Sequence, residues 1–187
     1  MTPYAVWAEI NLVSIAHNIR ELRRITHPAA KLMVAVKANG YGHGAEAVAR
    51  TALANGATHL GVARLEEGIA LRQAGIDAPI LIFGYTPARQ AAEFVEHDLM
   101  ASIFSLTSAK TFQNQLPKGS RLVDHVKVDT GMRRVGMLPH DARDGGPNDT
   151  EGLSAIEAIK AITTLENLEV EGLWNPFAWS DHADKQY

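Results

Sequence analysis

Apolar and polar residues alternate along this chain in a pattern that predicts repeated βα units. Short apolar runs typical of buried strands are separated by amphipathic stretches that end at glycine or enter polar turns. The predicted strands cover residues 31–37, 59–63, 79–85, 100–105, 122–129 and 168–174. The predicted helices cover residues 12–25, 45–55, 64–74, 87–97, 107–115 and 152–165, and the polar stretch 139–150 is predicted to be a loop.

Repeated βα units imply parallel strands covered by helices, and both an open doubly wound sheet and a (β/α)8 barrel fit this pattern. The faces of the predicted strands favour the barrel. On the fifth strand His125, Lys127 and Asp129 share one face. Val126 and Val128 lie on the opposite face. A polar face suits a barrel interior better than a sheet covered by helices on both sides, so we predict an α/β fold of the (β/α)8 TIM-barrel type.

The length of the chain limits how much of such a barrel it can form. A complete barrel needs eight units and about 250 residues. The 187 residues supply about six predicted strands and end soon after the last of them. We therefore expect residues 1–187 to form one incomplete barrel domain, with about six of eight strands, in a fragment or a truncated product.

Composition excludes several classes of function. The 18 basic and 21 acidic residues give a net charge of −3, which argues against a general nucleic-acid binder or a polybasic membrane anchor. Cysteine is absent, so disulfides, thiolate metal sites and a cysteine nucleophile are excluded. We find no HExxH spacing and expect no metal site. The sequence shows neither a secretion signal nor an apolar run of about 20 residues, so the cytoplasm is the simplest expected location.

The most informative motif is AVKANGYGHG at residues 35–44. Lys37 ends a predicted strand and precedes three glycines in alternate positions, Gly40, Gly42 and Gly44. Burial at a strand end would lower the pKa of a lysine and make it a better nucleophile toward an aldehyde, and the glycines would let backbone N–H groups approach an anion. A surface lysine that enters a glycine-rich connection fits the same residues, so the motif alone leaves both interpretations open.

Two long motifs resemble the alanine racemase family. Residues 35–44 are similar to the family's cofactor-lysine motif AVKANAYGHG and depart from it only at Gly40. Residues 127–136, KVDTGMRRVG, are similar to K-x-D-T-G-M-x-R-x-G. The segments WAEINL at 7–12 and GVA at 61–63, with EEG at 66–68, are also similar. The resemblance covers essentially the whole chain in the family's order.

The resemblance implies a pyridoxal 5'-phosphate (PLP) enzyme of fold type III that interconverts L- and D-alanine for cell-wall peptidoglycan precursors. Such enzymes combine an N-terminal (β/α)8 barrel with a C-terminal β domain and form homodimers. By resemblance, Lys37 holds PLP covalently and is one of two acid–base groups at the substrate α-carbon. Tyr41 is expected to hydrogen-bond the cofactor phosphate. Arg134 is expected beside the PLP phenolic oxygen and the substrate carboxylate, which suits the fixed fork of a guanidinium.

Lys127 has two interpretations. A lysine in mid-strand can be ion-paired or can extend its amine to solvent, since a lone ammonium inside a barrel is costly. In many members of the resembled family the matching lysine carries a carbamate, which turns a cation into an anion. We expect such a carbamate on Lys127 to hold the neighbouring Arg134.

One position departs from the family where the chemistry needs a side chain. After the sixth predicted strand the family has Thr-His-Phe or Ser-His-Phe, whereas this chain has WNPF at 174–177, with Pro176 in place of the histidine. The second base of the family is a tyrosine in the partner subunit's C-terminal domain. We therefore expect little or no racemase activity from the 187-residue chain alone. A non-catalytic PLP-binding homeostasis protein and an inactive truncated product stay as alternatives, although the segment 127–136 argues against the first.

The acidic pair Glu66 and Glu67 has a simple structural interpretation. Glu66 and Glu67 are expected at the start of the predicted helix 64–74, near the positive end of the helix dipole.

Overall fold

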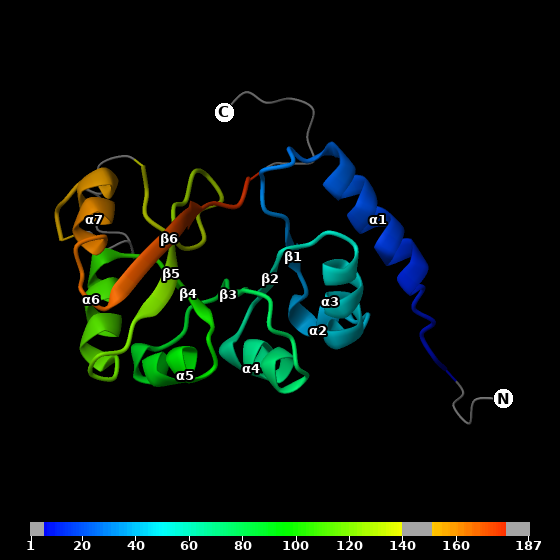
Figure 1. Ribbon diagram of the computed structural model, residues 1–187. Helices are drawn as coiled ribbons and strands as arrows, with labels where there is room; N and C mark the ends of the chain where they lie inside the picture. The colour runs from blue at the N-terminus through cyan, green and yellow to red at the C-terminus, as the bar shows by residue number, and fades with distance from the viewer. Residues whose placement is uncertain (1–5, 140–150, 179–187) are drawn as a thin grey trace. The chain divides into compact units, whose positions relative to one another are not determined.

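The computed structural model describes residues 6–139 and 151–178. The chain divides into two compact units, Met1–Ile82 and Phe83–Tyr187. In each unit helices alternate with parallel strands, as the sequence pattern predicts (Figure 1). Most of the predicted loop 139–150 lies outside the described residues. Among residues 6–139 and 151–178 no helix is long and apolar enough to cross a membrane.

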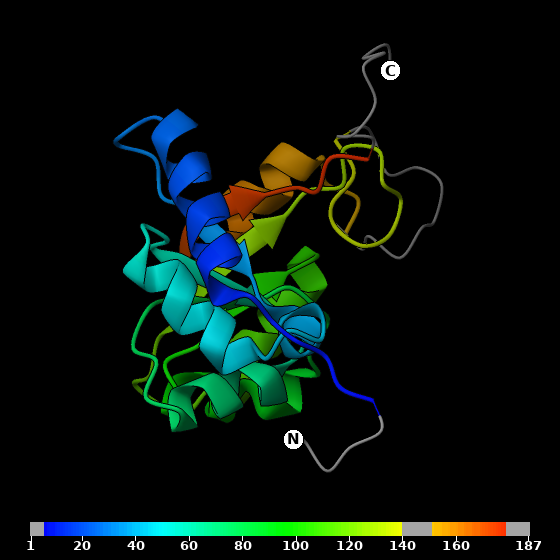
Figure 2. The same ribbon diagram turned by 90° about the vertical axis from the view of Figure 1, so that its right-hand side faces the viewer.

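The first unit carries three of the predicted strands. Its elements are α1 (Leu12–Ile25), β1 (Met33–Ala35), α2 (Lys37–Tyr41), α3 (Ala45–Ala54), β2 (His59–Val62), α4 (Leu65–Gln73) and β3 (Ile80–Ile82). Met33 of β1 pairs with His59 of β2, and Leu60 of β2 pairs with Ile80 of β3. Every residue of β2 and β3 is buried. Helix α1 lies beside α3 (Figures 1 and 2), where Ile19 packs with Ala52.

The second unit carries the other three strands. Its elements are η1 (Ala88–Gln90), α5 (Ala91–Glu96), β4 (Met100–Ile103), α6 (Leu106–Gln115), β5 (Leu122–Lys127), α7 (Ala155–Ile162) and β6 (Leu168–Trp174). Ala101 of β4 pairs with Asp124 of β5, and Leu122 of β5 pairs with Leu168 of β6. The pairing of β5 with β6 shifts register between Asp124 and His125.

Asp124 is an acidic residue in the core of the second unit. Its side chain is fully buried, and neither carboxyl oxygen has a hydrogen-bond partner in the part of the chain that the structure describes. Burial raises the pKa of Asp124 to about 7, because the interior disfavours the charged form.

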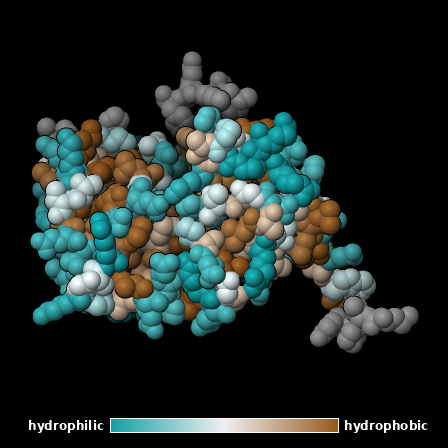
Figure 3. Space-filling view, in the orientation of Figure 1, coloured by the Kyte–Doolittle hydropathy of each residue, from teal (hydrophilic) through white to brown (hydrophobic). Residues whose placement is uncertain are grey.

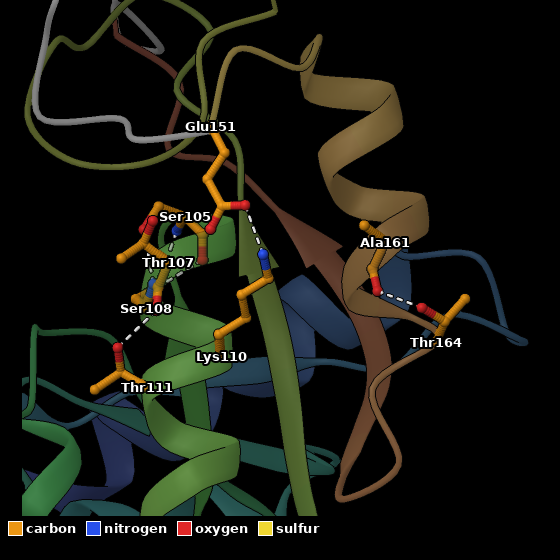
Figure 4. A network of polar contacts seen from close by, with 8 residues as sticks. All are labelled: Ser105, Thr107, Ser108, Lys110, Thr111, Glu151, Ala161 and Thr164. Atoms are coloured by element: carbon orange, nitrogen blue, oxygen red, sulfur yellow. Dashed lines mark hydrogen bonds and ion pairs between the residues drawn. The ribbon is translucent and has the colours of Figure 1, made fainter.

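A side-chain cap explains where α6 begins. Ser105 Oγ accepts from Ser108 N at 3.0 Å, and Ser108 Oγ accepts from Ser105 N at 3.0 Å, so each satisfies a free N–H at the start of α6. Figure 4 shows this cap beside the ion pair of Lys110 with Glu151, at 2.5 Å. The ion pair is partly exposed, so it contributes little beyond linking α6 to the segment before α7.

The six predicted strands and the predicted helices are present, but their ends differ. Each strand begins or ends within a few residues of its predicted limits, and the helix predicted at 87–97 consists of η1 followed by α5. Helix α2 was not predicted. The sequence pattern placed Lys37 at the end of a strand, whereas it is the first residue of α2. Figure 3 shows apolar surface at the beginning of α1, where Val13 is exposed, and over α7, where Ile156 is exposed.

Candidate functional site

Lys37 lies at the carboxyl end of β1. The preceding residue, Val36, is fully buried, and its N–H donates to the carbonyl of Gly61 on β2 at 2.8 Å. Lys37 itself is half-buried. The carboxyl ends of parallel strands are where (β/α)8 proteins build their active sites, so Lys37 stands where a catalytic amine would be useful.

The residues after Lys37 form a turn of left-handed backbone. Ala38, Asn39, Gly40 and Tyr41 have φ of 51°, 55°, 62° and 54°. A left-handed conformation costs an L-residue roughly 1–2 kcal/mol, so the three non-glycine residues of this turn need compensation. Part of it comes from backbone hydrogen bonds, among them Gly42 N to the carbonyl of Ala38 at 3.0 Å.

Glycine at position 40 also relieves crowding inside this turn. A Cβ there would lie 3.3 Å from both Ala45 N and Val48 Cγ2. Because φ is 62° as well, an alanine at this position needs a small shift of α3 and accepts a strained backbone. The departure from the resembled motif therefore fits the local structure better than the residue that the motif prescribes.

Lys37 and Tyr41 come together in the first unit. The amine Nζ of Lys37 lies 5.7 Å from the centroid of the Tyr41 ring, within the range of a cation–π contact. Tyr41 is 59% exposed. A Cβ added at Gly42 or Gly44 would meet nothing within 4 Å. A ligand therefore has access to the phenol, the amine and the glycine backbone.

The sequence predicted the position of Glu67 in its helix but not its hydrogen bond to the residue after Lys37. Glu67 lies in the first turn of α4, as predicted. Its Oε2 accepts from Ala63 N at 2.7 Å and from Arg64 N at 3.0 Å, and its Oε1 accepts from Ala38 N at 2.6 Å. The capping-box spacing at the start of α4 could have revealed the Arg64 contact. No local signal reveals the contact with Ala38, which is 29 residues away.

In the second unit the segment after β5 folds around the carboxylate of Asp129. Oδ1 accepts from Gly131 N at 3.0 Å and from Arg133 N at 2.9 Å, and Oδ2 accepts from Arg134 N at 2.8 Å. Asp129 is 2% exposed. Burial alone would raise its pKa, but these N–H groups and the nearby charge of Lys127 hold the pKa of Asp129 below its ordinary value. The carboxylate therefore fixes the backbone that presents Arg134.

Lys127 is a buried amine against an aromatic face. It is 5% exposed, and its Nζ lies 4.9 Å from the ring centroid of Trp174 on β6. The Trp174 ring in turn contacts Phe83, with centroids 5.2 Å apart. Burial lowers the pKa of Lys127, Asp129 opposes this shift, and Arg134 adds to it. More of the amine is therefore neutral, and able to act as a nucleophile, than in an exposed lysine.

The structure brings the predicted site residues together within each unit. Lys37 and Tyr41 belong to the first unit, whereas Lys127 and Arg134 belong to the second. The side chain of Arg134 is exposed and available to an anion. Pro176 follows β6, where it supplies neither a titratable group nor an N–H.

Replacing Arg133 by glycine is expected to stabilise the second unit by about 1 kcal/mol. Arg133 has φ of 52°, so its side chain strains the turn around Asp129, and its own N–H contact with Asp129 survives the change. Urea unfolding of wild type and Arg133→Gly measures the difference. Arg121→Gly, at an exposed position outside the turn, is the control and should not stabilise. A less stable Arg133→Gly variant would mean that the arginine side chain outweighs the strain.

The chain matches one family and several known proteins. Residues 10–187 match the family described as Alanine racemase, N-terminal domain. The chain is 44% identical to the alanine racemase of Methanococcus maripaludis, an alignment that covers 100% of this chain and 47% of that protein. It thus spans about half the length of the curated relatives it matches.

Two solved structures show the same fold. The alanine racemase of Clostridium difficile 630 superposes with a TM-score of 0.86 at 32% identity, over 99% of this chain and 48% of that one. The histidine racemase of Leuconostoc mesenteroides gives 0.76 at 29% identity, over 90% and 42%. These matches confirm the predicted fold class, an α/β fold with parallel strands that corresponds to part of an N-terminal racemase barrel.

Proposed function

The chain belongs to the alanine racemase family, and from this premise we propose that it supplies the PLP-binding part of an enzyme that interconverts L- and D-alanine. The observation that carries the proposal is Lys37 at the carboxyl end of β1, half-buried and beside Tyr41. The product D-alanine would serve cell-wall precursors. We propose alanine rather than another amino acid because the chain is 44% identical to an alanine racemase, although a histidine racemase shares the fold.

The residues near Lys37 fit PLP as a cofactor. When bound, PLP acts as an electron sink that stabilises negative charge at the substrate α-carbon. Lys37 would hold the cofactor through its amine and move a proton at one face of that carbon. Tyr41 would donate its phenolic hydrogen to the phosphate, and the open backbone at Gly42 and Gly44 leaves room for such a group.

By the family resemblance, Arg134 and a modified Lys127 would contribute charged groups to the binding of cofactor and substrate. Arg134 would bind the phenolic oxygen and the substrate carboxylate through the N–H groups of its guanidinium. A carbamate on Lys127 would hold Arg134 by opposite charge. The lowered pKa of Lys127 supports this modification, because only a neutral amine adds to carbon dioxide.

The assembly of the active enzyme would need more than these 187 residues. We propose a cytoplasmic homodimer, in which the second catalytic base comes from the partner's C-terminal domain. For the chain itself the proposal is limited to cofactor binding at Lys37. Pro176 favours a second candidate, PLP binding without racemisation, because proline cannot replace an acid–base or hydrogen-bonding side chain.

Borohydride trapping tests the proposal. The purified chain with PLP is expected to absorb at roughly 420 nm and, after reduction, to carry the adduct on the peptide that contains Lys37. Lys37→Arg keeps the positive charge but cannot form the adduct, so its absorbance and its labelled peptide should both be lost. Lys118→Arg, at an exposed lysine, is the matched control and should behave as wild type. Equal labelling of Lys37 and Lys118 in the wild type would refute a specific cofactor site.

A further inference from the structure

Glu67 joins the carboxyl ends of β1 and β2 through a single carboxylate. One oxygen accepts from Ala38 N at 2.6 Å, and the other accepts from Ala63 N at 2.7 Å and from Arg64 N at 3.0 Å. All three donors are backbone groups, and a charged acceptor makes such hydrogen bonds roughly twice as strong as neutral ones. The residue is half-buried, so solvent competes only in part for these contacts.

These contacts fix the backbone on both sides of Lys37. On its amino side, Val36 N donates to the carbonyl of Gly61 at 2.8 Å, and the Val36 side chain is fully buried. On its carboxyl side, Ala38 has φ of 51°, outside the right-handed helical region, and its N–H donates to Glu67. The backbone hydrogen bonds of Val36 and Ala38 therefore fix the direction of the Lys37 side chain. The first is made to β2 and the second to α4.

We propose that Glu67 is a positioning residue for Lys37: its carboxylate holds the left-handed turn in the conformation that aims the amine at the cofactor. This inference rests on the proposed function, since it assigns Glu67 a part in cofactor binding. Glu67 does not touch the reacting atoms and acts only through the backbone of Ala38.

A Glu67→Gln substitution tests the carboxylate, because glutamine cannot accept from Ala38 N and from the pair Ala63 N and Arg64 N at the same time. An amide of nearly the same size has one acceptor oxygen, and its NH2 group faces N–H donors that it cannot accept from. The oxygen can serve Ala38 or the pair Ala63 and Arg64, but not both. Glu66→Gln is the matched control, because Glu66 is exposed in the same helical turn and its replacement removes the same charge.

The experiment measures amide hydrogen exchange by NMR and PLP–borohydride labelling by peptide mass spectrometry on the full 187-residue chain. In the wild type, the Ala38 amide should be protected. In Glu67→Gln, exchange at Ala38 should rise and the Lys37 adduct should fall, each by about tenfold, as expected for one lost charge-assisted hydrogen bond. Labelling at Lys118 should not change, and Glu66→Gln should match the wild type in both measurements.

Each other outcome has a definite meaning. Unchanged Lys37 labelling despite faster Ala38 exchange would overturn the positioning role. Urea unfolding of the same variant separates positioning from folding, since a fall in the adduct explained by the unfolded fraction also overturns it. If Glu67→Gln does not fold, hydrogen exchange at the Ala38 amide of the wild type tests the proposal instead. An Ala38 amide that is not protected there contradicts it. A wild-type chain without a Lys37 adduct would refute the proposed function alone, and exchange at Ala38 would then decide whether Glu67 holds the turn.

Discussion

An Asp124→Leu variant is expected to be more stable than wild type by about 4 kcal/mol at pH 8, and by much less at pH 4. Burial raises the pKa of Asp124 from 3.8 to about 7 in the folded chain. Between these two values the native state binds more protons than the unfolded state, so stability falls as the pH rises. Above pH 7 the buried carboxyl is charged without a hydrogen-bond partner among the described residues, and leucine removes that cost.

Urea unfolding at pH 4 and pH 8 checks this expectation. Asp124→Asn should recover part of the gain at pH 8, because it removes the charge but leaves a buried amide. Asp77→Asn, at an exposed aspartate, is the control and should show neither effect. A gain for Asp124→Leu that is the same at both pH values would contradict the assignment, since packing alone does not depend on protonation.

An Asp129→Asn variant is expected to lose about 3 kcal/mol of stability at pH 7. The amide keeps one acceptor oxygen for Gly131 and Arg133 but turns its NH2 toward Arg134 N, which then lacks an acceptor. The pKa of Asp129 is lower in the folded state than its ordinary value of 3.8. The carboxylate therefore adds its full stabilisation to the folded state above pH 3.8, and this stabilisation is lost as the pH falls through the lower native pKa. The difference between variant and wild type should therefore shrink in strong acid.

Hydrogen exchange at three amides provides the local measurement for Asp129. Exchange at Gly131, Arg133 and Arg134 should rise together in Asp129→Asn, with Asp77→Asn again unchanged. Arg134 labelling by a guanidine-directed reagent should also rise, because the turn no longer fixes its backbone. Protection of all three amides in the variant would mean that the turn holds its shape without the carboxylate.

The sequence predicted the order of strands and helices well because that order follows from hydrophobic periodicity. It did not predict α2, since Ala38 and Tyr41 are not residues that usually adopt a left-handed backbone. Nor did it reveal the shift in register beside Asp124, which depends on the pairing of β5 with β6. Alternation along β5 puts Asp124 on the buried face with Leu122 and Val126, but the sequence could not show that its carboxyl lacks a hydrogen-bond partner among the described residues.

The candidate site divides in the same way between local and distant information. Lys37, Tyr41 and Arg134 were identified by motifs, which are contiguous in sequence. The Lys127–Trp174 contact and the Glu67–Ala38 hydrogen bond join residues that are far apart along the chain, and only the folded structure brings them together. The support of the motif residues is therefore harder to predict than the residues themselves.

The left-handed turn has a consequence for how this segment tolerates mutation. Ala38 and Asn39 are exposed, and exposed positions usually accept most side chains. At these two positions the backbone excludes valine, isoleucine and threonine, whose branched Cβ cannot accept positive φ without strain. A survey of natural or laboratory variants would therefore find a restricted alphabet on the molecular surface. The positive φ of the backbone at Ala38 and Asn39, rather than burial of their side chains, limits which amino acids fit there.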